Sequence, residues 1–329
     1  QSAPLLLFCL FCMGTQSTLF GPLKYAILPD YLNDKELIMG NSLIESGTFI
    51  AILLGQLLGT AVAGVPPYIV GGLVLLVAVG GTMTSLFMPS VPAKMPDTKI
   101  EWNIIKGTNS LIREAAADRP VFTSIIGISW FWFIGSVYTT QLPTFTQIHL
   151  GGNDNVFNLM LALFSIGIAI GSVLCAKLSH ECLILGLVTI GTLGLTVCGL
   201  LLVWLTHGQR FTELNGIIWF LSQAQAYPIM LVMSAIGFFG GFFSVPLYTW
   251  LQTASSETFR AHAVAANNII NGVFMVSAAI LSAVLLMLFD SITLLYLIVA
   301  VGNLPLIVYL IKREPKFIGD LTALLKISK

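Results

Sequence analysis

Residues 46–93 read SGTFIAILLGQLLGTAVAGVPPYIVGGLVLLVAVGGTMTSLFMPSVPA and contain no Asp, Glu, Lys or Arg. A transmembrane helix needs about 20 predominantly apolar residues, so this stretch is long enough for two. Gly64-Val65-Pro66-Pro67 interrupts it near the middle, and Gly and Pro in close succession are typical of a turn. The stretch therefore predicts two membrane spans joined by a tight turn.

The composition of the whole chain is that of a protein dissolved in lipid. Of its 329 residues 56% are hydrophobic and 9% are charged, whereas about a quarter are charged in a typical soluble domain. The 15 basic residues balance 15 acidic ones, so there is no net charge to attract nucleic acid. Charge-free runs predict an all-α membrane protein with nine spans, at residues 1–20, 43–63, 68–88, 121–142, 156–178, 182–205, 228–250, 268–289 and 292–311.

Basic residues are distributed unevenly over the loops between these spans. When the loops are assigned alternately to two sides, Arg210 stands alone on one side and all other Lys and Arg residues fall on the other. The positive-inside rule places the basic side in the cytoplasm. We therefore expect a cytoplasmic C-terminus and an outer position for Gln1.

Two segments of the chain resemble each other. Phe20-Gly-Pro-Leu-Lys-Tyr25 precedes a polar loop and an apolar helix near Gly47, and Ser244-Val-Pro-Leu-Tyr248 precedes the same pattern near Gly272. Six spans per period in one orientation are the arrangement of the major facilitator fold. The period predicts that nine of twelve transmembrane helices are present and that the first three are missing.

These features divide the chain into four parts. We expect residues 1–88 to form part of an N-terminal half (helices 4–6), residues 121–311 a C-terminal six-helix half, and residues 312–329 a cytoplasmic tail. Residues 89–120 are the longest cytoplasmic connection. Apolar residues at helical spacing predict an amphipathic helix there, on the inner membrane face: Ile104, Ile105, Leu111, Ile112 and Ala115.

The sequence gives little support for enzymatic chemistry. Cys9 and Cys12 form a CxxC inside an apolar span, where packing is the ordinary role of cysteine. His149 and Asp154 have the H-x4-D spacing of glycerophospholipid acyltransferases, but they lie in a short outer loop without a folded domain around it. We expect no enzyme, metal or cofactor within these 329 residues.

Polar residues inside the spans are the better candidates, because they are costly in lipid. Glu45 can pair with Lys24 or with a substrate head group, or it can reach the inner interface as a snorkelling carboxylate. A cavity lined by amides and hydroxyls with few charges suits a zwitterionic or amphiphilic solute, whereas interhelical hydrogen bonding explains any single residue equally well. The other candidates of this kind are Asn41, Tyr138, Gln141, Asn158, Asn267, Asn268 and Asn271.

Four motifs identify a family resemblance. They are Ser17-Thr-Leu-Phe-Gly-Pro-Leu-Lys-Tyr-Ala-Ile-Leu-Pro29, Gly40-Asn-Ser-Leu-Ile-Glu-Ser-Gly-Thr-Phe-Ile-Ala-Ile-Leu-Leu-Gly55, Trp130-Phe-Trp-Phe-Ile-Gly135 and Gly240-Gly-Phe-Phe-Ser-Val-Pro-Leu-Tyr248. The chain resembles the lysophospholipid transporters of the major facilitator superfamily, especially the version fused ahead of an acyltransferase and an acyl-carrier-protein ligase. Stand-alone members carry an Arg in the span corresponding to Val121–Leu142, which this chain lacks. That difference favours the fused subgroup.

The resemblance implies a function and a pathway. Such proteins move lysophospholipids, chiefly lysophosphatidylethanolamine, from the outer to the inner leaflet of the bacterial inner membrane, where an acyltransferase re-acylates them. Lys24, Tyr25, Asn41 and Glu45 are then expected near the inner end of the pathway.

Three hypotheses follow from the sequence. The first is a lipid-flipping facilitator that works by alternating access. The second is a facilitator for a drug or metabolite. The third is a membrane anchor that places a fused or associated acyltransferase at the bilayer.

Overall fold

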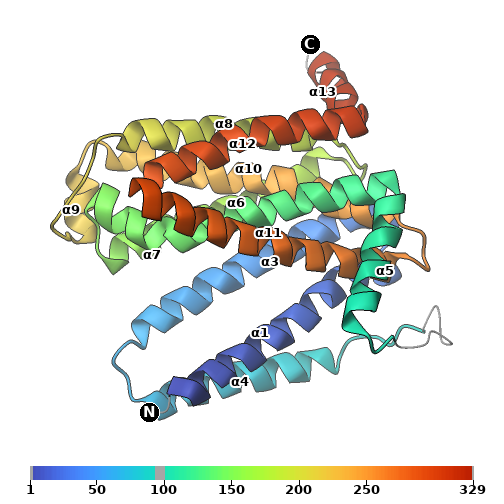
Figure 1. Cartoon of the computed structure of the whole chain (residues 1–329), viewed down its shortest axis with the longest axis horizontal. Helices are drawn as coiled ribbons and strands as arrows, with labels where there is room; N and C mark the ends of the chain where they lie inside the picture. The colour runs from blue at the N-terminus through green and yellow to red at the C-terminus, as the bar shows by residue number, and fades with distance from the viewer. Residues whose placement is uncertain (1–2, 93–100, 328–329) are drawn as a thin grey trace.

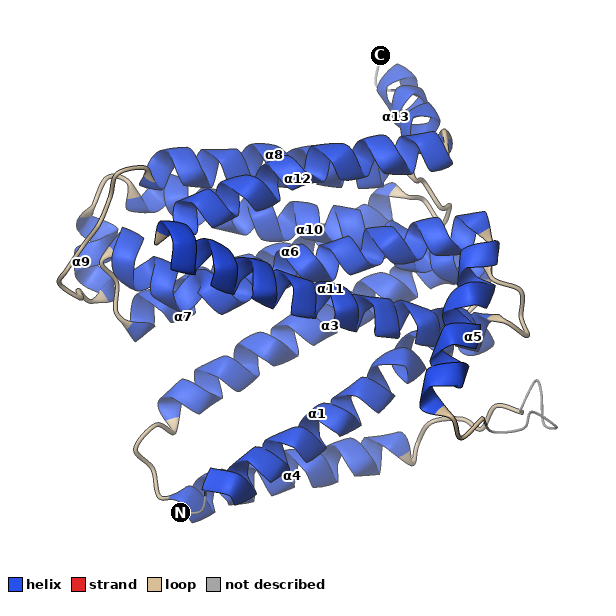
Figure 2. Ribbon diagram, viewed as in Figure 1, coloured by secondary structure: helices blue, strands red, loops and turns tan. Residues whose placement is uncertain are grey.

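The computed structural model describes residues 3–92 and 101–327, with side chains up to residue 323. Lys94, Lys99 and Lys329, which contribute to the predicted charge asymmetry, lie outside the described residues. Within these ranges the secondary structure is helical, apart from one isolated bridge pair between Gly152 and Asn215. Figures 1 and 2 show the helices: α1 (Ala3–Ala26), α2 (Leu28–Tyr31), α3 (Asp34–Ala61), α4 (Pro67–Ser85), α5 (Ile104–Ala117), α6 (Arg119–Leu150), α7 (Asp154–Leu178), α8 (Gly186–Thr206), α9 (Ile217–Ser222), α10 (Ala226–Ala254), α11 (Arg260–Phe289), α12 (Ile292–Arg313) and α13 (Lys316–Ile327).

The nine predicted spans are confirmed, because nine helices of the described residues are long and apolar enough to cross a membrane. Their bounds differ from the prediction in three helices above all. α3 begins at Asp34 and not at residue 43, and α11 begins at Arg260 and not at residue 268. The sequence also predicts α6 to end at residue 142, just before Pro143. The helix instead continues to Leu150 and ends at Gly151, whose φ of 61° is the left-handed conformation common after a helix. A proline is tolerated inside a membrane helix because neighbouring groups satisfy the backbone atoms that it frees.

Helices α6, α7, α8, α10, α11 and α12 form the main bundle, and its closest contact is between α7 and α10. A Cβ atom added to Gly171 of α7 would lie 2.0 Å from the Phe238 carbonyl oxygen of α10. A Cβ atom added to Gly237 of α10 would lie 2.1 Å from the Phe164 carbonyl oxygen of α7. The two backbones therefore touch directly, which small residues permit in membrane helices.

Helices α1, α3 and α4 lie beside the main bundle. α3 packs against α7 and α10, and α1 meets α11. Figure 1 shows α1 and α4 diverging from the main bundle toward the N-terminus. The described side chains of α1 before Gly21 are all exposed, and α4 has no buried residue. Apolar surfaces of this extent are compatible with contact with lipid, whose tails are as apolar as leucine.

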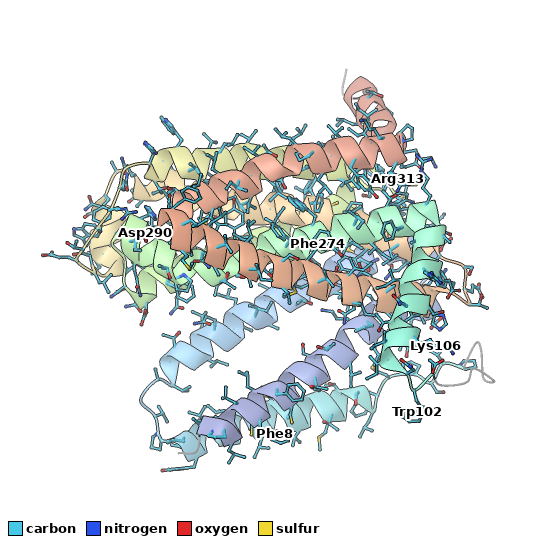
Figure 3. The ribbon with its side chains drawn as sticks, viewed as in Figure 1. Phe8, Trp102, Lys106, Phe274, Asp290 and Arg313 are labelled. Atoms are coloured by element: carbon cyan, nitrogen blue, oxygen red, sulfur yellow. The ribbon has the colours of Figure 1, made fainter. Side chains whose placement is uncertain are left out.

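The starts of α6 and α11, the end of α12 and the helix α5 lie at one end of the main bundle (Figure 1). We call this the basic end, because these segments carry Lys106, Arg113, Arg119, Arg260, Lys312 and Arg313. In Figure 3, Lys106 and Arg313 lie at this end and Asp290 at the opposite one. α5 runs across the spans at the basic end and packs on α11 and α6 (Figure 1). The described part of the chain thus places these cations at one end, as the loop assignment predicts.

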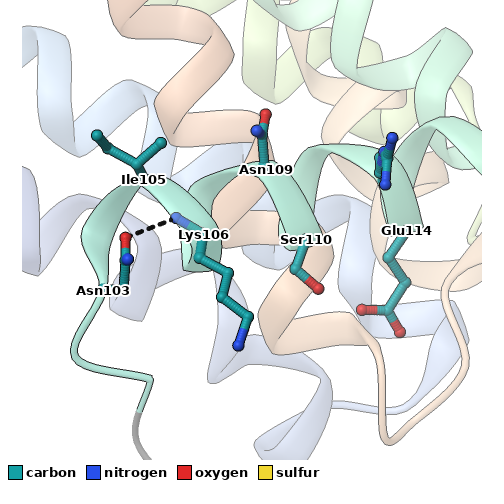
Figure 4. A pocket seen from close by; sticks show the side chains of 7 residues that line it. Asn103, Ile105, Lys106, Asn109, Ser110 and Glu114 are labelled. Carbon is teal, nitrogen blue, oxygen red and sulfur yellow. Dashed lines mark hydrogen bonds between the residues drawn. The ribbon is translucent and has the colours of Figure 1, made fainter.

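The polar face of α5 is held by contacts at its first turn. Asn103 caps the helix by accepting a hydrogen bond from the Lys106 backbone N–H at 3.0 Å (Figure 4), and Lys106 Nζ pairs with Glu101 Oε2 at 2.9 Å. This ammonium and the Asn103 N–H hold the pKa of the exposed Glu101 carboxyl below its usual value. The polar face borders an open depression of about 890 Å³, while Ala115 on the apolar face is buried.

At the same end, α13 is fixed to two helices of the main bundle. Phe317 is fully buried and packs edge-on against Trp250 of α10, with ring centroids 5.5 Å apart. Thr189 Oγ1 of α8 donates a hydrogen bond to the Phe317 carbonyl oxygen at 2.7 Å. Asp320 Oδ2 accepts from the Leu185 N–H at 2.9 Å, at the start of α8, where that helix has no side-chain cap of its own. α13 therefore ties the ends of α8 and α10 together.

Candidate functional site

A cavity of about 460 Å³ lies where α1 and α3 face α6, α10 and α11. It brings together residues that are far apart in the sequence, and five of them are among the candidates named above. Ten of the side chains that line it carry a polar atom: Ser17, Thr18, Lys24, Tyr25, Thr48, Trp132, Tyr248, Asn267, Asn268 and Asn271. Apolar atoms of Pro22, Ile52, Val264 and Met275 complete the wall, so the cavity is amphipathic.

Lys24 supplies the one formal charge among the described residues that line this cavity. It lies in the last turn of α1, next to residues that meet α11. Its Nζ donates a hydrogen bond to Thr48 Oγ1 at 2.9 Å and lies 5.1 Å from the centroid of the Tyr25 ring. Because no carboxylate lines the cavity, the lysine charge is complementary to an anionic group of a ligand.

An aromatic pair joins α1 to α10 beside the cavity. The rings of Tyr25 and Tyr248 are stacked, with centroids 4.0 Å apart and planes 4° from parallel. Trp132 Nε1 of α6 donates a hydrogen bond to the Tyr248 hydroxyl at 2.8 Å. Tyr25 in turn donates to Glu45 Oε2 at 2.9 Å. Both tyrosines are buried, so the pair is a packed contact between α1 and the main bundle.

Glu45 and Asn41 adjoin the cavity without lining it. Glu45 lies behind Tyr25 on α3 and is 1% exposed. Asn41 lies one turn earlier on α3, is also buried, and exchanges hydrogen bonds with Gln252 of α10 at 2.5 and 3.1 Å. Gln252 Nε2 also donates to the Tyr25 carbonyl oxygen at 2.8 Å. These bonds connect α1 and α3 to α10 near the basic end.

The three asparagines of α11 also line the cavity. Asn268 donates a hydrogen bond to the Thr18 carbonyl oxygen of α1 at 3.1 Å. Asn271 accepts one from Ser129 Oγ at 2.7 Å. Asn267 is buried, and its Oδ1 has no hydrogen-bond partner among the described residues.

Tyr138, Gln141 and Asn158 lie apart from this cavity. Tyr138 is buried between α6 and α12, where its ring lies 4.7 Å from that of Tyr296. Gln141 lies about one turn further along α6, and Asn158 belongs to α7. None of the three belongs to the lining of the 460 Å³ cavity.

Comparison with known proteins places these features in a family. A model described as Major Facilitator Superfamily matches residues 1–221. The chain belongs to the major facilitator superfamily. With its nine candidate spans, this superfamily member is a multi-pass membrane protein with an all-helical fold.

Proteins named lysophospholipid transporter are among the curated relatives of this superfamily member. The lysophospholipid transporter LplT of Enterobacter sp. (strain 638) is 29% identical over 262 residues, which are 78% of this chain and 61% of that protein. LplT proteins of Escherichia fergusonii and Shigella sonnei are 27% identical over the same coverage. The chain thus spans 61% of the length of these relatives.

Several residues that line the cavity of this superfamily member were not predicted from its sequence. Thr48 and Trp132 carry no pattern that separates them from ordinary span residues. Tyr248 could have been found, because it ends the Ser244–Tyr248 motif two residues after Pro246, at the position that Lys24 holds after Pro22. Tyr248 is in direct contact with Tyr25, the residue next to Lys24.

Proposed function

We propose that the protein moves lysophospholipids across the bacterial inner membrane for re-acylation, with the basic end and the C-terminus in the cytoplasm. The names of the LplT relatives support the substrate class. The observation that carries the proposal is Lys24, a single cation in an otherwise uncharged, amphipathic cavity between α1 and α11. A lysophospholipid head group carries a phosphodiester anion, which a lysine can bind through charge-assisted hydrogen bonds.

The rest of the cavity suits such a head group. Amide groups of Asn267, Asn268 and Asn271 can bind the polar atoms of ethanolamine and glycerol. The single acyl chain extends toward the apolar, exposed side of α1, where Leu19 is 68% exposed. The volume of about 460 Å³ accommodates a head group without its chain, so the chain remains at the lipid side during transport.

Transport takes place by alternating access in this proposal. Residues 1–88 contribute part of one half and residues 121–311 form the other, with residues 89–120 as the connection and 312–329 as the tail. The contacts of Tyr25 with Tyr248 and of Asn41 with Gln252 close the basic end. Breaking them opens the pathway toward the cytoplasm.

The test is uptake of labelled lysophosphatidylethanolamine in spheroplasts that lack their own lysolipid transporter and express the complete gene. Lys24→Gln removes the charge while keeping a hydrogen-bonding side chain. A hydrogen bond to a charged group contributes about 1.5–3 kcal/mol, so we expect uptake efficiency to fall roughly thirty-fold. Lys24→Arg should retain much more activity.

Lys35→Gln is the matched control, since Lys35 is an exposed lysine in the first turn of α3. Unchanged uptake by the Lys24→Gln variant would contradict the role of this charge. Competition by short-chain solutes at the concentration at which lysolipids compete would instead favour a facilitator for another small molecule.

A further inference from the structure

A second cavity, which we call the α9 cavity, lies at the end of the main bundle opposite the basic end (Figure 1). Its volume is about 230 Å³. Sites for drug-sized ligands have roughly 300–1,000 Å³, so the α9 cavity suits a smaller ligand, on the scale of one sugar ring. Its lining comes from the end of α6 (Leu150), the α8–α9 loop (Gln209, Phe211), α9 (Trp219, Phe220) and residues 223–229 at the start of α10.

Contacts between the α8–α9 loop and the turn after α6 fix one wall of the α9 cavity. The Phe211 N–H donates to the Ile148 carbonyl oxygen at 2.8 Å, and the Asn215 N–H donates to the Gly151 carbonyl oxygen at 2.7 Å. A Cβ atom added to Gly151 would lie 2.8 Å from the Phe211 ring, so this ring packs directly on the glycine backbone. The wall is therefore formed before a ligand arrives, which lowers the entropic cost of binding.

Three glutamines bring uncharged hydrogen-bonding groups to the α9 cavity: Gln209, Gln223 and Gln225. Gln209 Nε2 donates to the Leu205 carbonyl oxygen at 3.1 Å and to Gln225 Oε1. Gln223 Nε2 donates to the Trp219 carbonyl oxygen at 3.4 Å. Gln209 Oε1, Gln223 Oε1 and Gln225 Nε2 have no partner among the described residues. Hydroxyl groups can satisfy all three, because a hydroxyl both donates and accepts.

Aromatic rings complete the lining, and none of the residues that line the α9 cavity is charged. Phe211 and Trp219 meet edge-on, with ring centroids 5.7 Å apart. The adjacent cation, Arg210, pairs with Asp290 at 3.3 Å and does not belong to the lining (Figure 3 shows Asp290 at this end). An ion would lose its hydration here without gaining an opposite charge. A sugar-like polyol fits better, because its C–H face packs on an aromatic ring while its hydroxyls bond to amides.

We propose that the α9 cavity binds an uncharged polyol the size of one sugar ring. All its lining residues belong to the main bundle and its loops, so a bound polyol does not bridge to α1 or α3. The site is separate from the 460 Å³ cavity and does not depend on which solute the protein moves. With the basic end in the cytoplasm, as proposed above, it faces the periplasm. Vicinal hydroxyls reach that side as free sugars or as the terminal glycerol of phosphatidylglycerol.

Saturation-transfer NMR of the purified full chain in phosphatidylethanolamine nanodiscs tests the binding without detergents that carry sugar head groups. Methyl β-glucoside should bind saturably with a dissociation constant on the order of 1 mM, and the C–H groups of one ring face should receive most saturation. Glucuronate and glucosamine carry a charge and cyclohexanol lacks the set of hydroxyls, so each should bind at least roughly tenfold more weakly. Absence of saturable glucoside binding, or equal binding of cyclohexanol, would overturn the proposal.

Two variants locate the binding site on the protein. Gln223 is exposed, so Gln223→Leu removes one amide without opening the core, and the dissociation constant should rise roughly threefold to tenfold. Trp219→Leu removes a ring face and should abolish the preferential saturation of C–H groups. Gln56→Leu is the matched control, because Gln56 is an exposed glutamine of α3 outside the α9 cavity. Unchanged affinity of Gln223→Leu would contradict the proposed site, whether or not Trp219→Leu folds.

The lipid composition of the nanodiscs identifies the source of the polyol. Phosphatidylglycerol in the nanodiscs competes with the glucoside if its terminal glycerol occupies the α9 cavity. Phosphatidic acid is the control, since it carries negative charge without the diol. A rise of the apparent dissociation constant with phosphatidylglycerol alone assigns the site to that lipid head group, and any other result assigns it to a free sugar.

Discussion

Replacing Gly171 with alanine tests the closest contact of the main bundle, where α7 meets α10. A Cβ atom at this position would lie 2.0 Å from the Phe238 carbonyl oxygen, and real Cβ atoms essentially never come within 3.0 Å of such a neighbour. The obstacle is backbone rather than a flexible side chain. The two helices must therefore separate by about 1 Å, a distance that forfeits roughly a quarter to a half of the dispersion energy of the atoms lining the gap.

The expected cost follows from this geometry. Overpacking a well-packed interior costs about 1–3 kcal/mol, and we expect Gly171→Ala to lower the free energy of unfolding by about 2 kcal/mol. For a protein of this size that corresponds to a fall of roughly 4 °C in the unfolding midpoint. Tryptophan fluorescence during thermal unfolding of the detergent-solubilised protein measures it.

Gly55→Ala is the matched control on α3. A Cβ atom at Gly55 meets no described atom within 4 Å, so only helix propensity changes, and alanine is favoured over glycine by about 0.5–1 kcal/mol. The two substitutions should therefore shift the midpoint in opposite directions. Equal midpoints for the two variants would refute direct backbone contact between α7 and α10.

Two further substitutions probe the ends of the main bundle. Phe317→Ala removes a fully buried ring from its contact with Trp250 and should lower the free energy of unfolding by about 3–5 kcal/mol in the same assay. Ile318 is 47% exposed, so Ile318→Ala should lower it much less. Similar losses for the two variants would show that α13 is not docked through Phe317. Arg210→Ala breaks an ion pair with Asp290 whose side chains are 61% and 89% exposed, so the change should stay below about 1 kcal/mol, and a larger loss would mean that the pair is shielded from solvent.

Much of the fold follows from the sequence because lipid imposes simple requirements on the chain. Each span must be apolar for about 20 residues, and the few charges therefore mark the loops. Lys24, Tyr25 and the α11 asparagines, which the polar residues of the spans and the family resemblance indicate, share one cavity. Tyr25 and Tyr248 of the two similar motifs are in contact.

The remainder of the site depends on which face of each helix points inward, and hydropathy does not determine this when every face is apolar. Trp132 and Tyr138 are both on α6, six residues apart, which rotates one from the other by roughly 240° around the helix axis. Trp132 therefore reaches Tyr248 of α10 while Tyr138 faces Tyr296 of α12. The end of α6 predicted at Pro143 is wrong for a related reason. Proline removes a backbone hydrogen bond, but neighbouring groups in the surrounding helices satisfy the freed backbone atoms, so the helix continues.

The docking of α13 limits the motions open to the protein. Gly186 at the start of α8 lies so close to α13 that a Cβ atom there would be 2.4 Å from the Leu321 nitrogen. Because Phe317 also packs against Trp250, α13 connects the ends of α8 and α10, and the two helices are expected to move as one rigid unit. Separation of Tyr248 from Tyr25 then requires α8, α10 and α13 to move together, or α1 and α3 to move while these three helices stay in place. The tail thereby reduces the number of helices that can move independently of one another.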